Sequence, residues 1–80
     1  MNLKILSPTA TLYEGAVQYV VLPGAKGAFE VLPDHAPIIS SLQRGAIRYA
    51  TAKDTETTVD IQSGFVEVNN NQITVCIEVS

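Results

Sequence analysis

The apolar residues of this chain recur at every second position, and over no window of about eleven residues do they take the spacing of an amphipathic helix. The clearest case is near the C-terminus, where Ile73, Val75, Ile77 and Val79 fall on one face of an expected strand. From this alternation and the turn residues that interrupt it, strands are expected over residues 3–5, 9–13, 16–22, 28–32, 38–42, 46–52, 57–61, 65–68 and 73–79.

Turn residues separate these segments at intervals of about 8 to 12 residues, which is typical of an all-β sandwich or barrel. Pro23-Gly24 and Pro33-Asp34 are expected to form two of the turns, and a polar turn is expected at 53–56. The run Asn69–Gln72 joins the last two strands with residues that tolerate left-handed backbone angles. We therefore predict an all-β domain.

One stretch, Val20 to Gly45, concentrates the residues that restrict the backbone. It holds three of the four prolines, three of the five glycines and the only histidine, His35. Glycine adopts angles that other residues avoid, and proline fixes φ, so the path of the chain is tightly specified here. Because no catalytic set of residues accompanies this stretch, we interpret it as a shaped contact surface.

The composition is that of a small globular domain. Of the 80 residues, 46% are hydrophobic and 16% are charged, whereas disordered chains are poorer in apolar residues and richer in charge. We expect a single domain, residues 1–80, with a thin core, because so short a chain buries only about two-thirds of its unfolded surface. The apolar fraction is high for this size, so either nearly every strand buries one face or a partner covers part of the outer surface.

The charge argues against a nucleic-acid partner. The net charge is -3, and the five basic residues are scattered rather than gathered into a stripe that could follow phosphates. A single cysteine, Cys76, fits a reducing compartment. The N-terminal residues do not resemble a signal peptide, and no apolar run approaches the roughly 20 residues of a membrane helix. We therefore expect a cytoplasmic protein that reaches a membrane only through a protein partner.

Candidate catalytic and metal-binding groups are few. One histidine, one cysteine and scattered carboxylates cannot form a zinc site of the usual kind, and no G-x-S-x-G motif marks a serine nucleophile. Asp34 precedes His35, but adjacent residues of an extended chain point to opposite faces, so Asp34 is badly placed to orient the imidazole. Cys76 is expected to pack as a small apolar residue within a strand. We therefore predict no catalytic activity, no metal and no cofactor.

The segment Gly24–Gly27 resembles a phosphate-binding loop only superficially, since it lacks the G-x-x-x-x-G-K-[ST] spacing and no helix is expected after it. A hairpin turn with Lys26 in solvent is the favoured interpretation. Lys26 could also carry a lipoyl or biotinyl group at a hairpin tip, although Ala25 and Gly27 differ from the usual neighbours of such a lysine. A free-standing β-sandwich adaptor or carrier is therefore an alternative, which a prosthetic group detected on Lys26 by mass spectrometry would favour.

Glu30 interrupts the apolar run from Ala28 to Leu32. Alternation places its side chain on the same face as these two residues. It either faces solvent at the edge of a sheet or forms a salt bridge in an interface with a partner.

Several motifs resemble the N-terminal domain of the epsilon subunit of the bacterial F-type ATP synthase, which is called delta in mitochondria. The central motifs are L-P-G at 22–24, G-A-F-E-V-L-P-D-H-A-P at 27–37, and the pair Leu42 and Gly45. G-F-V-E-V at 64–68, the Asn turn and I-T-V at 73–75 are similar to the family's closing hairpin, and residues 3–7 and 13–15 to its opening strands. The resemblance covers essentially the whole chain.

The resemblance implies a flattened β-sandwich of about ten short strands at the foot of the rotating central stalk. Such a domain lies between the gamma subunit and the polar loops of the membrane c-ring, contacts the alpha/beta head only indirectly, and reaches the membrane through the membrane sector (Fo) alone. It implies no catalytic role: the domain helps hold gamma to the ring, whose proton-driven rotation drives ATP synthesis in the head. The implied location is the cytoplasmic face of the bacterial inner membrane, as a peripheral subunit.

The resemblance also assigns residues to two contacts. The implied gamma-facing positions are Ser7, His35 and Ser40. The implied c-ring-facing positions are Ala25, Lys26, Gly27 and Ala28, with Glu30 nearby.

The chain differs from the family at some of these positions and in length. The family usually has an acidic residue where this chain has Ala28, often a glycine where it has Glu30, and Gly or Asn where it has Asp34. We expect these differences to change the details of the ring contact but not its location. Most members continue into a C-terminal helical hairpin that can inhibit ATP hydrolysis and in some cases binds ATP, whereas this chain ends at Ser80. We therefore expect neither inhibition by hairpin insertion nor a nucleotide site.

Overall fold

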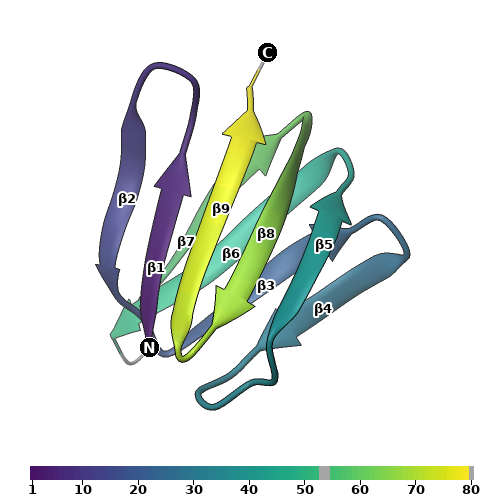
Figure 1. Ribbon diagram of the computed structural model, residues 1–80. Coiled ribbons are helices and arrows are strands. Elements are labelled where there is room, and N and C mark those ends of the chain that lie inside the picture. The colour runs from purple at the N-terminus through teal and green to yellow at the C-terminus, as the bar shows by residue number, and fades with distance from the viewer. Residues whose placement is uncertain (53–54, 80) are drawn as a thin grey trace.

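The computed structural model describes residues 1–52 and 55–79, which form strands, turns and loops and contain no helix (Figure 1). Within this part of the chain the strands are β1 (Asn2–Leu6), β2 (Thr11–Ala16), β3 (Tyr19–Gly24), β4 (Gly27–Val31), β5 (Ile38–Leu42), β6 (Gly45–Ala52), β7 (Thr55–Ile61), β8 (Ser63–Asn69) and β9 (Gln72–Glu78). The predicted all-β class is confirmed.

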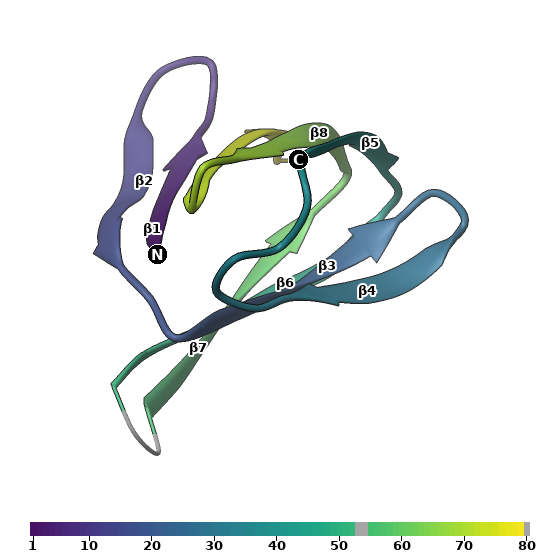
Figure 2. The ribbon, with the colours of Figure 1, turned by 60° about the horizontal axis from the view of Figure 1, so that its bottom comes forward.

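The strands form one hydrogen-bonded sheet that curls into two facing layers (Figures 1 and 2). The front layer has the order β2-β1-β9-β8-β5, and the back layer has the order β4-β3-β6-β7. The layers join where β5 meets β3, through the pair of Gly24 and Leu42. The pair β1 and β9 is parallel, and the other pairs are antiparallel. This arrangement is the sandwich expected from the sequence.

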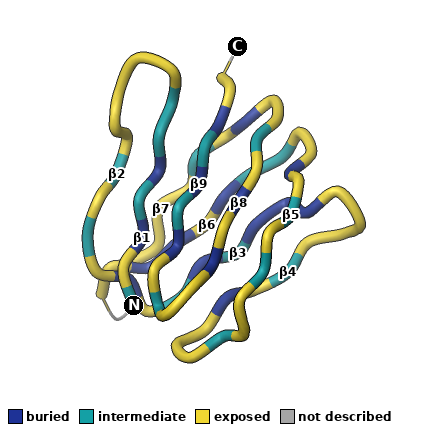
Figure 3. The backbone as a smooth tube through the Cα atoms, in the orientation of Figure 1, coloured by how far each residue is buried: buried dark blue, intermediate teal, exposed yellow. Residues whose placement is uncertain are grey.

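The core lies between the two layers, and along most strands buried or half-buried positions alternate with exposed ones (Figure 3). Ile5, Val66 and Val75 of the front layer have no exposed surface, nor have Leu22 and Ile47 of the back layer. No buried polar or charged side chain occurs among the described residues. Full burial of a Val, Leu or Ile side chain contributes about 1.5–3 kcal/mol. Apolar packing therefore holds the layers together far more than the short junction at Gly24 does.

The turn between β8 and β9 confirms a local prediction. Asn69 pairs with Gln72, so the hairpin has a two-residue loop, and both loop residues are left-handed, with φ of 50° at Asn70 and 60° at Asn71. Positive φ at both central residues matches the type I′ turn, whose twist suits a β-hairpin and whose preferred residues include Asn. The left-handed backbone of this turn therefore explains why asparagines occupy it.

The predicted turn at Pro23-Gly24 is wrong, because both residues belong to β3. The hairpin turn predicted over Gly24–Gly27 is confirmed, since the chain reverses at Ala25 and Lys26 and Lys26 is exposed. Proline is tolerated in this strand because β3 leaves β6 after Val21 and meets β5 only at Gly24. On this side of β3, Pro23 thus lies between the ladders to β6 and β5, where its missing N–H interrupts neither, and on the other side it pairs with Ala28 of β4.

Other predicted boundaries also shift. The strand expected over 16–22 begins at Tyr19, and β2 continues to Ala16. Val79, expected on the same face of the last strand as Ile77, follows the end of β9 and is 53% exposed, whereas Ile77 is buried. Of the polar turn expected at 53–56, residues 53 and 54 lie outside the described residues, and the other two belong to β7.

Candidate functional site

The three residues expected to face gamma are spread along the front layer and do not form a cluster. Ser7 follows the C-terminal end of β1, and His35 lies in the loop that leads into β5. Because β1 is parallel to β9, and β9 and β5 are both antiparallel to β8, strands β1 and β5 run in the same direction. Ser7 and His35 therefore lie at opposite ends of this layer, with Ser40 of β5 between them. A partner that touches all three must cover a broad face.

Ser40 lies on the inward-facing side of β5. It pairs with Val66, which is fully buried, and it is itself half-buried, with its hydroxyl donating to the carbonyl oxygen of Ser41 at 3.1 Å. The neighbours Ile39 and Ser41 are exposed on the outer side. The outer surface of β5 is therefore formed by these neighbours.

The four residues expected to face the c-ring lie at the tip and first positions of the β3–β4 hairpin, and all four are exposed. The hairpin is tied to β5 by the amide of Ala25, which donates to the carbonyl oxygen of Ser41 at 2.9 Å. Together with Ser40, these residues line a groove of about 650 Å³. The structure thus brings one expected gamma-facing residue next to the expected ring-facing set. β4 follows the hairpin directly, so no helix dipole supports a phosphate at Lys26.

Glu30 is exposed on β4, opposite Val21 of β3. Since β4 lies at the end of the back layer, the carboxylate faces solvent at a sheet edge. Both interpretations of Glu30 given by the sequence require an exposed side chain, so this geometry does not choose between a solvated edge and an interface salt bridge.

The loop that carries His35 is held by short hydrogen bonds. The His35 amide donates to the carbonyl oxygen of Leu32 at 3.2 Å, and its ring Nδ1 lies 2.8 Å from the carbonyl oxygen of Ala36. Asp34 has a left-handed backbone, with φ of 66°, and its carboxylate accepts a hydrogen bond from Asn71. As predicted, Asp34 does not orient the imidazole, but the reason differs, because the chain turns at Asp34 rather than being extended and its carboxylate is bonded to Asn71.

The described residues offer little reactive chemistry. Across residues 1–52 and 55–79, no group of three or more His, Cys, Asp or Glu side chains could hold a metal ion. Cys76 is half-buried within β9. Nor does this part of the chain contain a helix long and apolar enough to cross a bilayer.

An apolar stripe crosses the outer surface of the front layer, one residue per strand, and sequence reasoning missed it. Its members are Leu12 (β2), Leu6 (β1), Cys76 (β9), Phe65 (β8) and Ile39 (β5). Phe65 pairs with Cys76, and Cys76 occupies the same row as Leu6 through the β1–β9 pair. On β5 the direct partner of Phe65 is Ser41, and Ile39 lies diagonally across from Phe65 on the same face. Leu12, Phe65 and Ile39 are 46%, 53% and 76% exposed, and these are the exposed large apolar side chains found within the described strands.

Acidic groups flank this stripe. Glu67 pairs with Ile39 on one side, and Glu78 follows two residues after Cys76 on the same face of β9. The stripe spans four strand spacings, about 19 Å at roughly 4.8 Å each. An exposed apolar stripe of this kind would suit a partner with an apolar contact region, and Lys4 lies in the same row as Glu67 across β1, β9 and β8.

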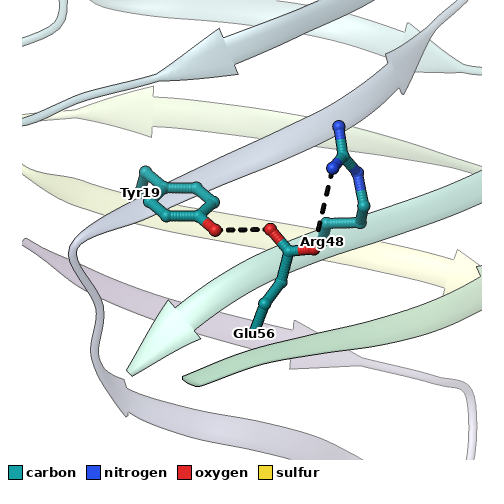
Figure 4. A network of polar contacts seen from close by, with 3 residues as sticks. All are labelled: Tyr19, Arg48 and Glu56. Carbon is teal, nitrogen blue, oxygen red and sulfur yellow. Dashed lines mark hydrogen bonds and ion pairs between the residues drawn. The ribbon is translucent and has the colours of Figure 1, made fainter. Parts of the chain in front are cut away.

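The outer surface of the back layer is polar by contrast. Tyr19 of β3 donates a hydrogen bond from its hydroxyl to Glu56 of β7, and Arg48 of β6 lies 3.6 Å from the other carboxylate oxygen of Glu56 (Figure 4). The hydrogen bond to Glu56 is the main cause that raises the pKa of Tyr19 above its usual 10.0, with a smaller contribution from desolvation. The two outer faces of the sandwich are thus chemically distinct.

Comparison with known proteins agrees with this geometry. Residues 1–79 match the family described as ATP synthase, Delta/Epsilon chain, beta-sandwich domain. A relative named ATP synthase epsilon chain from Desulfitobacterium hafniense is 39% identical over 74 residues, which cover 92% of this chain and 55% of the relative. Its namesake from a Sulfurovum species is 37% identical over 78 residues, covering 98% of this chain and 61% of that one. The chain thus spans somewhat more than half the length of these curated relatives.

Solved structures support the same fold. A chain of the mitochondrial ATP synthase of Euglena gracilis, in a structure of its OSCP/F1/c-ring, superposes with a TM-score of 0.87 at 17% identity, covering 94% of this chain and 48% of that chain. A chain from the central stalk and c-ring of the Tetrahymena thermophila mitochondrial ATP synthase superposes with a TM-score of 0.80 at 11% identity. The match covers 96% of this chain and 62% of that chain. With a family match over nearly the whole sequence and this sandwich as its fold, the chain belongs to the ATP synthase delta/epsilon beta-sandwich domain family.

Proposed function

We propose that this domain is a non-catalytic coupling element of an ATP synthase rotor. In this proposal the outer surface of its front layer docks against the gamma subunit, and the tip of its β3–β4 hairpin faces the polar loops of the c-ring. Its contact with the alpha/beta head is indirect, through gamma. It is peripheral to the membrane, on the cytoplasmic face of the bacterial inner membrane, and reaches the membrane through the rotor ring.

The apolar stripe is the observation that carries this proposal. Ile39 of β5, the last strand of the front layer, is 76% exposed, and Phe65 of the neighbouring strand β8 is 53% exposed on the same face. Exposed apolar stripes with charged flanks mark protein contact surfaces. The stripe runs from Leu6, which precedes Ser7, to Ile39, which precedes Ser40, although the Ser40 side chain itself faces inward.

The stiffness of the sandwich supports a role in transmitting torque. The core contains closely packed aliphatic side chains from both layers, and such interiors deform little under load. The β3–β4 hairpin is bonded to β5 at Ala25, so a load on its tip passes directly into the front layer.

Site-directed photo-crosslinking in the assembled synthase tests the proposal. A benzoylphenylalanine that replaces Ile39 is expected to form adducts with gamma, and one that replaces Lys26 is expected to form adducts with the c subunit. The same group in place of Thr58, which is exposed on the polar outer face and pairs with Arg48, serves as the matched control. Absence of gamma adducts from position 39, or an equal yield from position 58, would contradict the proposed orientation.

Inhibition of ATP hydrolysis is a separate property of the family. The described residues contain no helix that could enter the head. We therefore expect this 80-residue chain, added to its own catalytic head, to leave the rate of ATP hydrolysis unchanged. Strong inhibition would show that the sandwich itself reaches the catalytic subunits.

A further inference from the structure

Two loops of the sandwich are joined by a pair of hydrogen bonds between Asp34 and Asn71, which are 37 residues apart. The amide of Asp34 donates to Oδ1 of Asn71 at 2.6 Å, and Nδ2 of Asn71 donates to Oδ1 of Asp34 at 2.9 Å. Both residues have left-handed backbones, with φ of 66° and 60°. One asparagine amide thus satisfies both the backbone and the side chain of a single residue in another loop.

Asn71 also holds a third segment. Its carbonyl oxygen accepts a hydrogen bond of 2.9 Å from the amide of Asn2, at the start of β1. The loop that contains Asp34 connects β4 of the back layer to β5 of the front layer, so its path is not set by either sheet. The bonds to Asn71 are the link that ties this crossing to the end of the front layer.

We propose that Asn71 is the positioning residue for His35, acting through Asp34. His35 follows Asp34 directly, and its own hydrogen bonds, to Leu32 and Ala36, lie within the same loop. These local bonds shape the loop but do not place it on the sandwich, whereas Asn71 does. The β8–β9 turn therefore sets how the histidine is presented to a partner, which by the proposed function is gamma.

The chain offers matched variants for a test. Asn71→Gly removes both side-chain bonds but keeps the turn, since Asn-Gly is the preferred pair for a type I′ loop. Asn70→Gly makes the same substitution one residue earlier, at a φ of 50°, without touching the link to Asp34. Asp34→Asn keeps an oxygen that can accept from Asn71 and tolerates the left-handed backbone, so it serves as the conservative variant.

Amide hydrogen exchange of the 80-residue chain is the first measurement, and it needs no partner. In Asn71→Gly the Asp34 amide is expected to exchange about three- to tenfold faster, the change that corresponds to losing one or two hydrogen bonds. In Asn70→Gly and in Asp34→Asn, the exchange rate of the amide at position 34 is expected to stay within about twofold of the wild-type rate. No change in Asn71→Gly, or an equal change in Asn70→Gly, would overturn the link itself.

Affinity for purified gamma is the second measurement. Asn71→Gly is expected to weaken binding about three- to tenfold, Asn70→Gly to leave it unchanged and Asp34→Asn to retain it. If exchange at Asp34 rises but affinity is unaltered, the link is structural and the positioning role is wrong. If the wild-type chain itself does not bind gamma, the proposed function fails, and the positioning of a gamma contact fails with it, while the exchange result stands.

Discussion

Replacing Ile39 by serine should separate the affinity of this domain for gamma from its stability. Ile39 is 76% exposed, so about three-quarters of its apolar surface is still available to a partner and about one-quarter is already covered by the fold. Full burial of an isoleucine side chain contributes about 1.5–3 kcal/mol. Covering the remaining surface is therefore worth about 1.1–2.3 kcal/mol to binding, and the covered part about 0.4–0.8 kcal/mol to folding.

These values convert into two measurable changes. Ile39→Ser is expected to weaken gamma binding by about sixfold to fiftyfold, measured by calorimetric titration. In urea denaturation the same variant is expected to lose less than about 1 kcal/mol of unfolding free energy. Serine suits the site because Ser40 and Ser41 follow it in β5, so the strand itself should form normally.

A second exposed β-branched residue lies off the stripe and serves as a control. Val79 is 53% exposed beyond the end of β9, and Val79→Ser should leave the affinity within about twofold of the wild type. The reasoning is refuted if Ile39→Ser binds as tightly as the wild type, or if Val79→Ser weakens binding equally. A loss of more than about 2 kcal/mol in unfolding free energy for Ile39→Ser would refute the burial assignment instead.

Two further predictions concern the sandwich itself. In Gly64→Ala the new Cβ would overlap the carbonyl oxygen of Cys76 on the neighbouring strand, so the unfolding free energy is expected to fall by about 1–3 kcal/mol in urea denaturation. The control Ser63→Ala is expected to be nearly neutral. Equal denaturation midpoints for the two variants would contradict the predicted overlap. Because the folded pKa of Tyr19 is raised above 10.0, the stability contribution of its neutral form is fully present below pH 10.0 and is lost as pH rises through the folded value. Glu56→Ala should lower this pKa toward 10.0, seen as a lower midpoint in a tyrosinate absorbance titration, and an unchanged midpoint would exclude Glu56 as the cause.

Local features of this fold could be predicted because neighbouring residues determine them. Alternation identified the last strand, in which Ile73, Val75 and Ile77 are buried. The asparagine run indicated left-handed backbones, and Asn70 and Asn71 have them. Both arguments use residues only a few positions apart, where side-chain period and backbone preference act directly.

The stripe and the β3 junction could not be predicted in the same way. Each strand contributes one outward apolar residue, and Ile39 or Phe65 alone is an ordinary exposed side chain. They become one surface only through the register of β5 on β8 and of β8 on β9, which no local pattern specifies. Pro23-Gly24 misled for a related reason: the pair has the composition of a turn, but its place between two ladders allows a strand.

Asp34 illustrates how a local backbone conformation leads to a long-range contact. A φ of 66° explains why this position suits Gly, Asn or Asp, which enter the left-handed region at the lowest cost. Among these residues, glycine would satisfy the backbone alone, whereas aspartate also presents an oxygen that Asn71 can reach. Asn71 is in turn available because a type I′ turn places a left-handed asparagine there. Two local backbone conformations thus create a long-range contact that neither predicts; the sequence indicated the left-handed angle at Asn71 but not the one at Asp34. The position of the loop that contains Asp34 and His35 therefore depends on the β8–β9 turn, which contains none of the residues proposed to contact gamma.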